Sequence, residues 1–144
     1  MILYYGNIGW DTNNSAELEG LWQGLLLAGG HNFHPLEVEG DSQILINMAK
    51  NILNGSHARK IATIWRIEAR LEAIELELHR NRAITFTHIK REGNKVADFM
   101  ANVGVENDHS LITGKLNTIL THDKAQECSH LVQKYAVPPD AGVR

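Results

Sequence analysis

Residues 35–42 have the sequence PLEVEGDS, and this stretch decides the fold class. Leu36 and Val38 alternate with two glutamates, and this period of two predicts a strand with one apolar face. The strand leads straight into Asp41, after which apolar residues at helical spacing predict a helix over 42–53, closed by an Asn-Gly pair. A strand that passes directly into a helix is typical of an α/β unit.

A second strand with the same alternation completes this unit. Ile84 and Phe86 alternate with threonines, and the strand is expected to end near His88. Between the two strands, apolar residues from Ile61 to Leu78 predict an amphipathic helix of about six turns. A strand–helix–helix–strand crossover places its strands parallel, with a right-handed connection.

Three further elements are expected around this crossover. Residues 2–8 are typical of a short strand, and residues 94–103 predict a helix. A helix over 15–28 is predicted by one apolar face, which consists of Leu18, Leu21, Trp22, Leu25 and Leu26, and it is expected to end at Gly29-Gly30. The order of strands and helices indicates an α/β fold.

Residues 105–144 have a weaker pattern. Cys128, Leu131, Val132 and Tyr135 are spaced as one face of a helix, which predicts a C-terminal extension with one amphipathic helix. Residues 1–104 are therefore expected to form the main domain. Because Cys128 is the single cysteine, an internal disulfide and a thiolate zinc site are excluded, and we expect it to be a small core residue.

The composition favours one soluble, intracellular domain. The chain has 144 residues, of which 43% are hydrophobic, and this is enough for one core. No apolar stretch reaches the roughly 18 residues that a membrane span needs, and the N-terminus lacks the pattern of a signal peptide. We therefore expect no membrane partner.

The net charge of −3 excludes a protein that binds phosphates with its whole surface. Contacts with nucleic acid would be local and would involve one of two basic clusters. The first is Arg59-Lys60, and the second comprises Arg80, Arg82, His88, Lys90, Arg91 and Lys95. A solvated surface explains both clusters equally well.

Three acidic residues lie at or near the ends of predicted strands and helices, where catalytic and metal-binding residues are often found. Glu17 is expected in the first turn of a helix, Asp41 just past a strand, and Asp98 on the helix after the second strand. Carboxylates at the ends of parallel strands suit an oxygen-seeking ion such as magnesium. Each acid also has a structural explanation: Glu17 forms a capping box with Asn14, Asp41 caps the next helix, and Asp98 is solvent-exposed.

Three segments together resemble type 1 ribonuclease H, and more closely the retroelement-derived, reverse-transcriptase-associated domains of plants. The segments are 12–18 (TNNSAEL), 39–43 (EGDSQ) and 88–98 (HIKREGNKVAD), within a resemblance that runs from about residue 4 to residue 104. The resemblance implies a mixed sheet with flanking helices. It also implies hydrolysis of the RNA strand of RNA–DNA hybrids by two magnesium ions held on carboxylates.

The resemblance further implies roles for individual residues. Glu17 and Asp41 match ligands of the ion at the leaving group, and Asp98 matches the ligand on the water side. His88 matches the histidine that assists proton transfer or product release. The positions that match contacts with nucleic acid are Thr12, Asn13, Asn14, Gln43, Lys90, Arg91 and Asn94. Amide side chains can both donate to and accept from the 2′-hydroxyl groups that distinguish RNA from DNA.

The chain departs from the family ahead of Thr12. The family's first catalytic aspartate lies on a central strand that precedes this motif, yet the stretch before Thr12 suffices for one strand at roughly 3.3 Å per residue, not for three. We therefore expect an N-terminally truncated domain that lacks the first two strands and the aspartate that bridges both ions. Weak or absent hydrolysis follows. A start codon farther upstream would restore these strands.

The same loss would leave the strand that ends at Asp41 with an unpaired edge. Residues 2–8 are expected to cover this edge. The alternatives are the C-terminal tail or another chain, as in a homodimer. A non-enzymatic module that keeps the fold in order to bind nucleic acid or a protein is the second functional interpretation.

Overall fold

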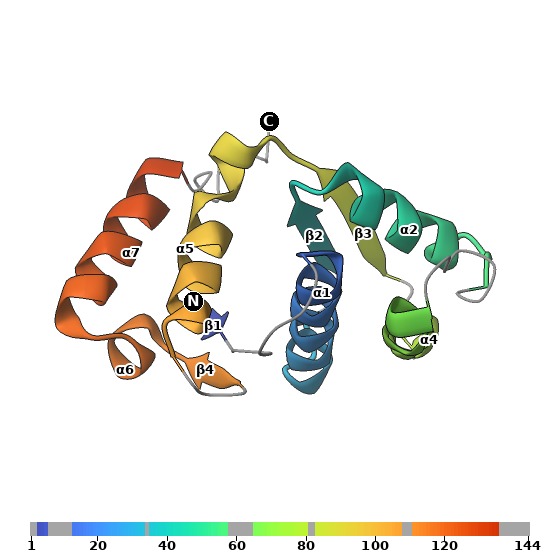
Figure 1. Ribbon diagram of the computed structural model, residues 1–144, viewed down its shortest axis with the longest axis horizontal. Helices are drawn as coiled ribbons and strands as arrows, with labels where there is room; N and C mark the ends of the chain where they lie inside the picture. Colours follow the sequence, from blue (N-terminus) through green and yellow to red (C-terminus); the bar gives the residue numbers. More distant parts are fainter. Residues whose placement is uncertain are drawn as a thin grey trace. The chain divides into compact units, whose positions relative to one another are not determined.

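The computed structural model describes residues 3–5, 13–33, 35–57, 65–80, 83–107 and 111–135. Helices and short strands alternate along the chain, and the predicted α/β class is confirmed (Figure 1). The elements are β1 (Leu3–Tyr5), α1 (Asn13–Gly30), β2 (Leu36–Gly40), α2 (Gln43–Leu53), α4 (Trp65–Arg80), β3 (Ile84–His88), the 3-10 helix η1 (Arg91–Asn94), α5 (Lys95–Val105), β4 (Ile112–Gly114), α6 (Leu116–Ile119) and α7 (His122–Tyr135).

The chain forms two compact units, each with a core of its own. The crossover unit is Trp10–Ile89, and the terminal unit combines Met1–Gly9 with Lys90–Arg144. The crossover unit holds α1, α2, α4 and the sheet of β2 and β3, and the terminal unit holds the remaining elements. The division into a main domain of residues 1–104 and an extension of residues 105–144 stays a prediction.

β2 and β3 pair in parallel, as the crossover pattern predicts. Leu36 lies opposite Ile84 and Gly40 opposite His88, so the two strands end together. Just past this end, the Ile89 N–H donates to the carbonyl of Gly40 at 2.9 Å. The carboxyl ends of both strands therefore lie at one edge of the sheet.

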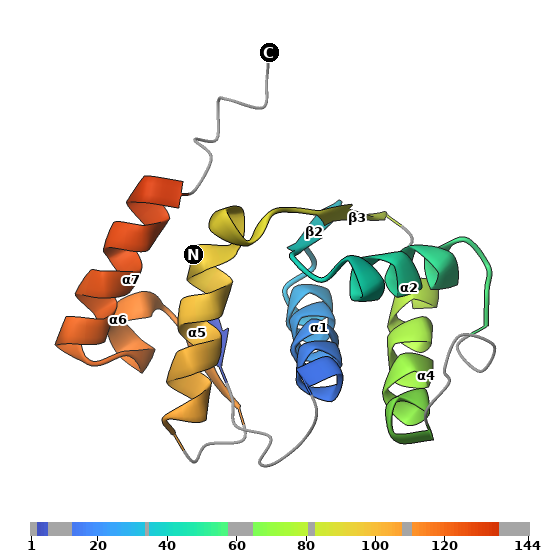
Figure 2. The ribbon, with the colours of Figure 1, turned by 45° about the horizontal axis from the view of Figure 1, so that its top comes forward.

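α1, α2 and α4 lie along the sheet of β2 and β3 (Figure 2). Their apolar faces share a core with one face of this sheet. Side-chain burial alternates along both strands, which confirms the predicted period of two. On the helices, positions three and four residues apart gather on the buried face. The buried residues are Leu18, Leu25, Leu45, Ile46, Ala49, Ile52, Leu71, Ile74, Leu78, Ile84 and Phe86.

α1 is longer than its sequence pattern predicts. It begins at Asn13, two residues before the predicted start, and includes the glycine pair that was expected to end it. It ends instead in a Schellman motif, in which Asn32 adopts a left-handed conformation with φ 54°. The Phe33 N–H then donates to the carbonyl of Ala28 at 3.0 Å. Asparagine tolerates this conformation better than most residues with a Cβ atom.

Leu26, which the sequence pattern places on the apolar face of this helix, lies outside the core, and its side chain is 36% exposed. The buried face of α1 is centred on Leu18, Leu25 and Ala28. At roughly 100° per residue, Leu26 falls at the margin of that face.

A charged and aromatic cluster joins α1 to α4. The Arg70 Nε atom lies 2.6 Å from Glu19 Oε2, and its guanidinium carbon lies 3.9 Å from the centre of the Trp22 ring. The Arg70 and Glu19 side chains are only 33% and 21% exposed, so water and salt screen this pair less than an open surface pair. α4 itself confirms the second part of the predicted long helix, whose first part, from Ile61, lies outside the described residues.

In the terminal unit, β1 pairs antiparallel with β4, and Tyr5 lies opposite Ile112. The expectation that residues 2–8 cover the strand ending at Asp41 is therefore wrong for the described part of that segment. The physical reason is that Leu3 and Tyr5 bury their side chains in the core of the terminal unit, which fixes the face that β1 presents. The phenol of Tyr5 also donates to the carbonyl of Ile119 at 3.3 Å.

α5 and α7 pack in the same core as β1. Cys128 is fully buried there, as predicted for a small core residue. The predicted C-terminal helix is confirmed as α7. The buried residues of this core are Leu3, Tyr5, Met100, Val103 and Cys128.

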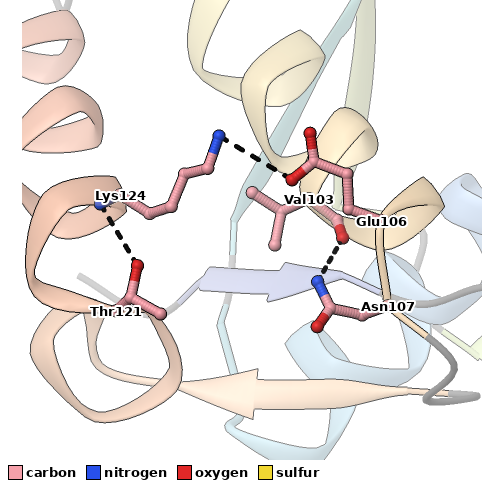
Figure 3. Close-up of polar contacts among 5 residues, drawn as sticks. All are labelled: Val103, Glu106, Asn107, Thr121 and Lys124. Atoms are coloured by element: carbon pink, nitrogen blue, oxygen red, sulfur yellow. Dashed lines mark hydrogen bonds and ion pairs between the residues drawn. The ribbon is translucent and has the colours of Figure 1, made fainter.

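Polar contacts secure the C-terminal end of α5 and the start of α7 (Figure 3). The Asn107 side-chain amide donates to the carbonyl of Val103 at 2.6 Å, so it satisfies a carbonyl in the last turn of α5. The Lys124 Nζ atom lies 3.7 Å from Glu106 Oε2. The backbone N–H of Lys124 donates to the Thr121 hydroxyl at 3.4 Å. The first and third of these contacts satisfy backbone groups at the C-terminal end of α5 and at the start of α7.

None of the helices in the described ranges is long and apolar enough to cross a membrane.

Replacing Ile74 by alanine should lower the free energy of unfolding by about 2–5 kcal/mol, because this side chain is fully buried in the core of the crossover unit. Leu76 on the same helix is 62% exposed, so Leu76→Ala should change the free energy of unfolding by no more than about 0.5 kcal/mol. Urea unfolding followed by circular dichroism measures both values. Equal losses for the two variants would contradict the packing of α4.

Candidate functional site

The end of the parallel sheet brings two of the predicted site residues together. Gly40 lies opposite His88, and Asp41 follows Gly40 directly. The His88 Nε2 atom lies 3.2 Å from the backbone carbonyl oxygen of Asp41. Because a carbonyl oxygen only accepts, Nε2 is the protonated ring nitrogen in this contact, and Nδ1 is left as the acceptor of a neutral ring.

Ser42, rather than Asp41, caps α2. Ser42 has an extended backbone, with φ −90° and ψ 104°, and its hydroxyl accepts from the Leu45 N–H at 3.4 Å. The structural explanation of Asp41 as the helix cap is therefore wrong. The Asp41 side chain is half-buried at the end of β2, one residue before the cap.

Glu17 lies farther inside α1 than its sequence pattern predicts. Since α1 begins at Asn13, Glu17 is its fifth residue and lies beyond the first turn, where it is exposed. The capping box of Asn14 with Glu17 is wrong, because Asn14 is already part of the helix. Thr12 and the side chains of Asn13 and Asn14 lie outside the described residues.

Gln43 is the first residue of α2, and its side chain is exposed. Its amide donates to the Asn47 side-chain oxygen, one turn along the helix, at 2.9 Å. The contact holds the amide along α2 and uses one of its donors. The other donor and the carbonyl oxygen can still meet a ligand.

Asp98 belongs to the terminal unit, where it lies in the first turn of α5. Its side chain is half-buried, so it is less exposed than the structural explanation from the sequence implies. Asn94 occupies the cap position of α5 without a hydrogen bond from its side chain to the helix. Lys90 and Arg91 precede it and are exposed.

The remaining basic residues contribute unequally to a charged surface. Arg80 is exposed and pairs with Glu77 at 3.0 Å, so part of its charge is already balanced. Lys95 is half-buried. Arg59, Lys60 and Arg82 lie outside the described residues.

The donor chemistry of the three acids suits magnesium, which prefers carboxylate and water oxygens. Within the described ranges, no three His, Cys, Asp or Glu side chains form a group able to hold a metal ion. Glu17 and Asp41 belong to the crossover unit and Asp98 to the terminal unit. The convergence of all three on one ion therefore stays a prediction.

Two other reactive side chains do not offer a nucleophile. Burial raises the pKa of the Cys128 thiol, so the thiolate form is disfavoured at neutral pH. Burial also raises the pKa of the Tyr4 phenol. Both groups belong to the terminal unit, and neither was a predicted site residue.

The sequence analysis missed two features that position Asp41. The signal for the serine cap was present in the adjacent pair Asp41-Ser42, because both residue types are favoured caps. The contact between His88 and the Asp41 carbonyl had no signal of its own, since it depends on the register of two strands that are far apart in the sequence.

Residues 8–104 match the reverse transcriptase-like family, which is ribonuclease H-like. The match covers more than half of the chain and includes Glu17, Asp41, His88 and Asp98. The chain therefore belongs to this family and contains a ribonuclease H-like domain. Comparisons with curated proteins and with solved structures found no match.

Replacing Ser42 by alanine should lower the free energy of unfolding by about 1 kcal/mol, because α2 loses the acceptor for the Leu45 N–H. Ser42→Asp should retain most of the stability, since aspartate is an equally favoured cap. Thermal unfolding of both variants measures the difference. Unchanged stability in Ser42→Ala would contradict the assignment of the cap.

Proposed function

We propose that this chain is a nucleic-acid-binding domain of the type 1 ribonuclease H class, from the retroelement-derived plant branch. The proposed activity class is hydrolysis of the RNA strand of an RNA–DNA hybrid. Its main structural support is the position of Asp41 and His88, which meet at the carboxyl ends of two parallel strands. In open α/β sheets this is the end at which ligands bind.

In this proposal Glu17, Asp41 and Asp98 hold magnesium. Magnesium bound by these residues would supply an activated water and charge stabilisation at the scissile phosphate. The oxygen-only donor set supports magnesium over zinc or copper, which prefer sites with nitrogen or sulfur ligands. Asp41 is the best-supported ligand, because the cap at Ser42 and the end of β2 hold the backbone on both sides of it.

His88 is proposed to handle a proton near the reacting phosphate. Its Nε2–H donates to the Asp41 carbonyl at 3.2 Å, which orients the ring. A neutral ring then presents Nδ1 as a proton acceptor. The exposed position of His88 allows exchange of this proton with solvent.

Two groups of residues are proposed to bind the substrate, one for the sugar hydroxyl groups and one for the phosphates. Gln43, together with Thr12, Asn13 and Asn14, is proposed to contact 2′-hydroxyl groups, which mark the RNA strand. The exposed Lys90 and Arg91 are proposed to contact phosphates, with Asn94 beside them. These contacts are local, in agreement with the net charge of −3.

The 144-residue chain is proposed to hydrolyse poorly. Its sequence contains no acid before Asp11, and β1 carries only Leu-Tyr-Tyr, so the family's bridging aspartate has no match here. Two divalent charges would then rest on three carboxylates. Loss of the group shared by both ions raises the cost of holding them together.

With magnesium and an RNA–DNA hybrid, the purified chain should show weak or undetectable cleavage. Asp41→Asn should abolish any residual cleavage, because it removes a charged ligand while keeping the shape of the side chain. Glu127→Gln is the matched control, since this exposed acid on α7 lies outside the proposed site. Gel analysis of an end-labelled hybrid measures the rate.

Cleavage at an ordinary enzymatic rate of about 1 s⁻¹ or more would contradict the proposed impairment. Residual cleavage that survives Asp41→Asn would contradict the assigned ligand.

The chain should bind a hybrid with an affinity that falls as salt rises, because phosphate contacts release counterions. Lys90→Gln combined with Arg91→Gln should weaken binding and reduce the slope of log K against log salt by about 2, roughly one unit for each lost contact. Fluorescence anisotropy at several salt concentrations measures this slope. Binding that is undetectable at low salt would count against a nucleic-acid function, whether enzymatic or not.

A further inference from the structure

One residue of α4 contacts α1 at two points that lie about one turn apart. The Arg70 Nε atom lies 2.6 Å from Glu19 Oε2, and the guanidinium carbon lies 3.9 Å from the centre of the Trp22 ring. Because Glu19 and Trp22 are three residues apart on a helix, they lie on the same side of α1. Arg70 therefore restrains both the rotation of α1 about its axis and its position along α4.

The contacts of Arg70 have a defined geometry. The Gln23 side-chain amide donates to Glu19 Oε1 at 3.1 Å, so both carboxylate oxygens of Glu19 have a partner. The guanidinium is planar, and it combines the ion pair with stacking on an aromatic ring, which an ammonium group would do less well. By contrast, Arg80 on the same helix is 74% exposed in its pair with Glu77, and such surface pairs are easily exchanged for water.

Glu17 lies on the other side of the buried face of α1. Successive helix residues are separated by roughly 100°, and Leu18, which is only 1% exposed, points into the core between Glu17 and Glu19. The two glutamates therefore flank the buried face, one on each side. A rotation of α1 that moves Glu19 away from Arg70 also moves Glu17 relative to the sheet.

We propose that Arg70 is a positioning residue for Glu17, and that it keeps Glu17 in the orientation needed to bind magnesium together with Asp41. The effect is transmitted through Glu19, Trp22 and the rigid helix, so Arg70 itself contacts neither ion nor substrate. This inference rests on the proposed function, because it takes Glu17 and Asp41 as magnesium ligands.

Apolar packing alone controls the rotation of a helix less well than these polar contacts do. The hydrophobic effect is non-directional, whereas hydrogen bonds weaken when their angle changes. A rotation of about 10° moves a side chain that lies roughly 5 Å from the helix axis by about 1 Å. Magnesium requires near-ideal octahedral geometry with ligands at about 2.0–2.1 Å, so a shift of this size removes a ligand.

The sign of the effect separates positioning from a direct influence of charge. Arg70 is a cation in the same compact unit as Glu17 and Asp41. Coulomb repulsion alone therefore predicts that removing its charge strengthens the binding of a divalent cation. Positioning predicts weaker binding.

The test measures the affinity of the full chain for Mn²⁺, which favours the same oxygen ligands as Mg²⁺ and broadens the NMR signals of nearby amides. Titration is followed at the amides of Glu17 and Asp41. Arg70→Met should weaken binding about tenfold, as is typical when a residue that supports a metal ligand is lost. Arg70→Lys, which keeps a cation beside Glu19, should bind more tightly than Arg70→Met. Arg80→Met, the same substitution in the exposed pair of α4, should leave the affinity unchanged.

A double-mutant cycle shows whether Arg70 acts through Glu17. Glu17→Gln alone should weaken Mn²⁺ binding, and adding Arg70→Met to it should cause no further loss. A general structural role of Arg70 would instead add its own loss to that of Glu17→Gln. Circular dichroism confirms that each variant is folded.

Unchanged or stronger Mn²⁺ binding in Arg70→Met would overturn this inference and leave the proposed magnesium site in place. A loss of the same size in the Glu17→Gln background would also overturn it. If Mn²⁺ affects neither the Glu17 amide nor the Asp41 amide of the unaltered chain, the proposed site itself is overturned, and the inference with it. The two kinds of failure are therefore distinguishable.

Discussion

The parallel pairing of β2 with β3 is the constraint on which the crossover unit depends. Five consecutive residue pairs, from Leu36 opposite Ile84 to Gly40 opposite His88, set which side chains face the helices. A shift of one residue would turn Val38 and Phe86 out of the core and bring glutamate and threonine into it. The same register brings the ends of both strands together, so the core and the candidate site are fixed by one set of backbone bonds.

The backbone around Asp41 in the candidate site is restrained by hydrogen bonds from several neighbouring elements. Asp41 lies between the last residue pair of β2 and β3 and the capped helix α2. Its backbone carbonyl also accepts a hydrogen bond from the His88 ring. The freedom of the backbone at Asp41 is therefore low. Glu17 reaches its position differently, because α1 is attached through its own buried face and through the cluster of Glu19, Trp22 and Arg70. Helix packing, rather than a strand end, thus determines where Glu17 lies.

Sequence analysis predicted the crossover unit well because β2, β3 and the helices between them carry strong periodic patterns. The prediction failed where a local sequence pattern is compatible with more than one neighbouring strand or more than one capping residue. A three-residue strand such as Leu3–Tyr5 buries the same alternate side chains against any neighbour, and only the fold selects β4. Similarly, Asp41 and Ser42 are both good caps, and the backbone conformation of Ser42 decides between them. Membership of the family was predictable because three motifs occur in the family's order along the chain. Such motifs can be recognised from residue types and spacing without knowing how the side chains pack.

The pairing of Leu3 with Gly114 also bears on how the protein assembles during synthesis. Residues of the crossover unit are complete in the growing chain before β4 has been translated, so β1 must wait for its partner while that unit collapses. Closing so long a loop carries an entropic cost that grows with the logarithm of loop length. The terminal unit is therefore expected to complete its core only after the crossover unit has formed.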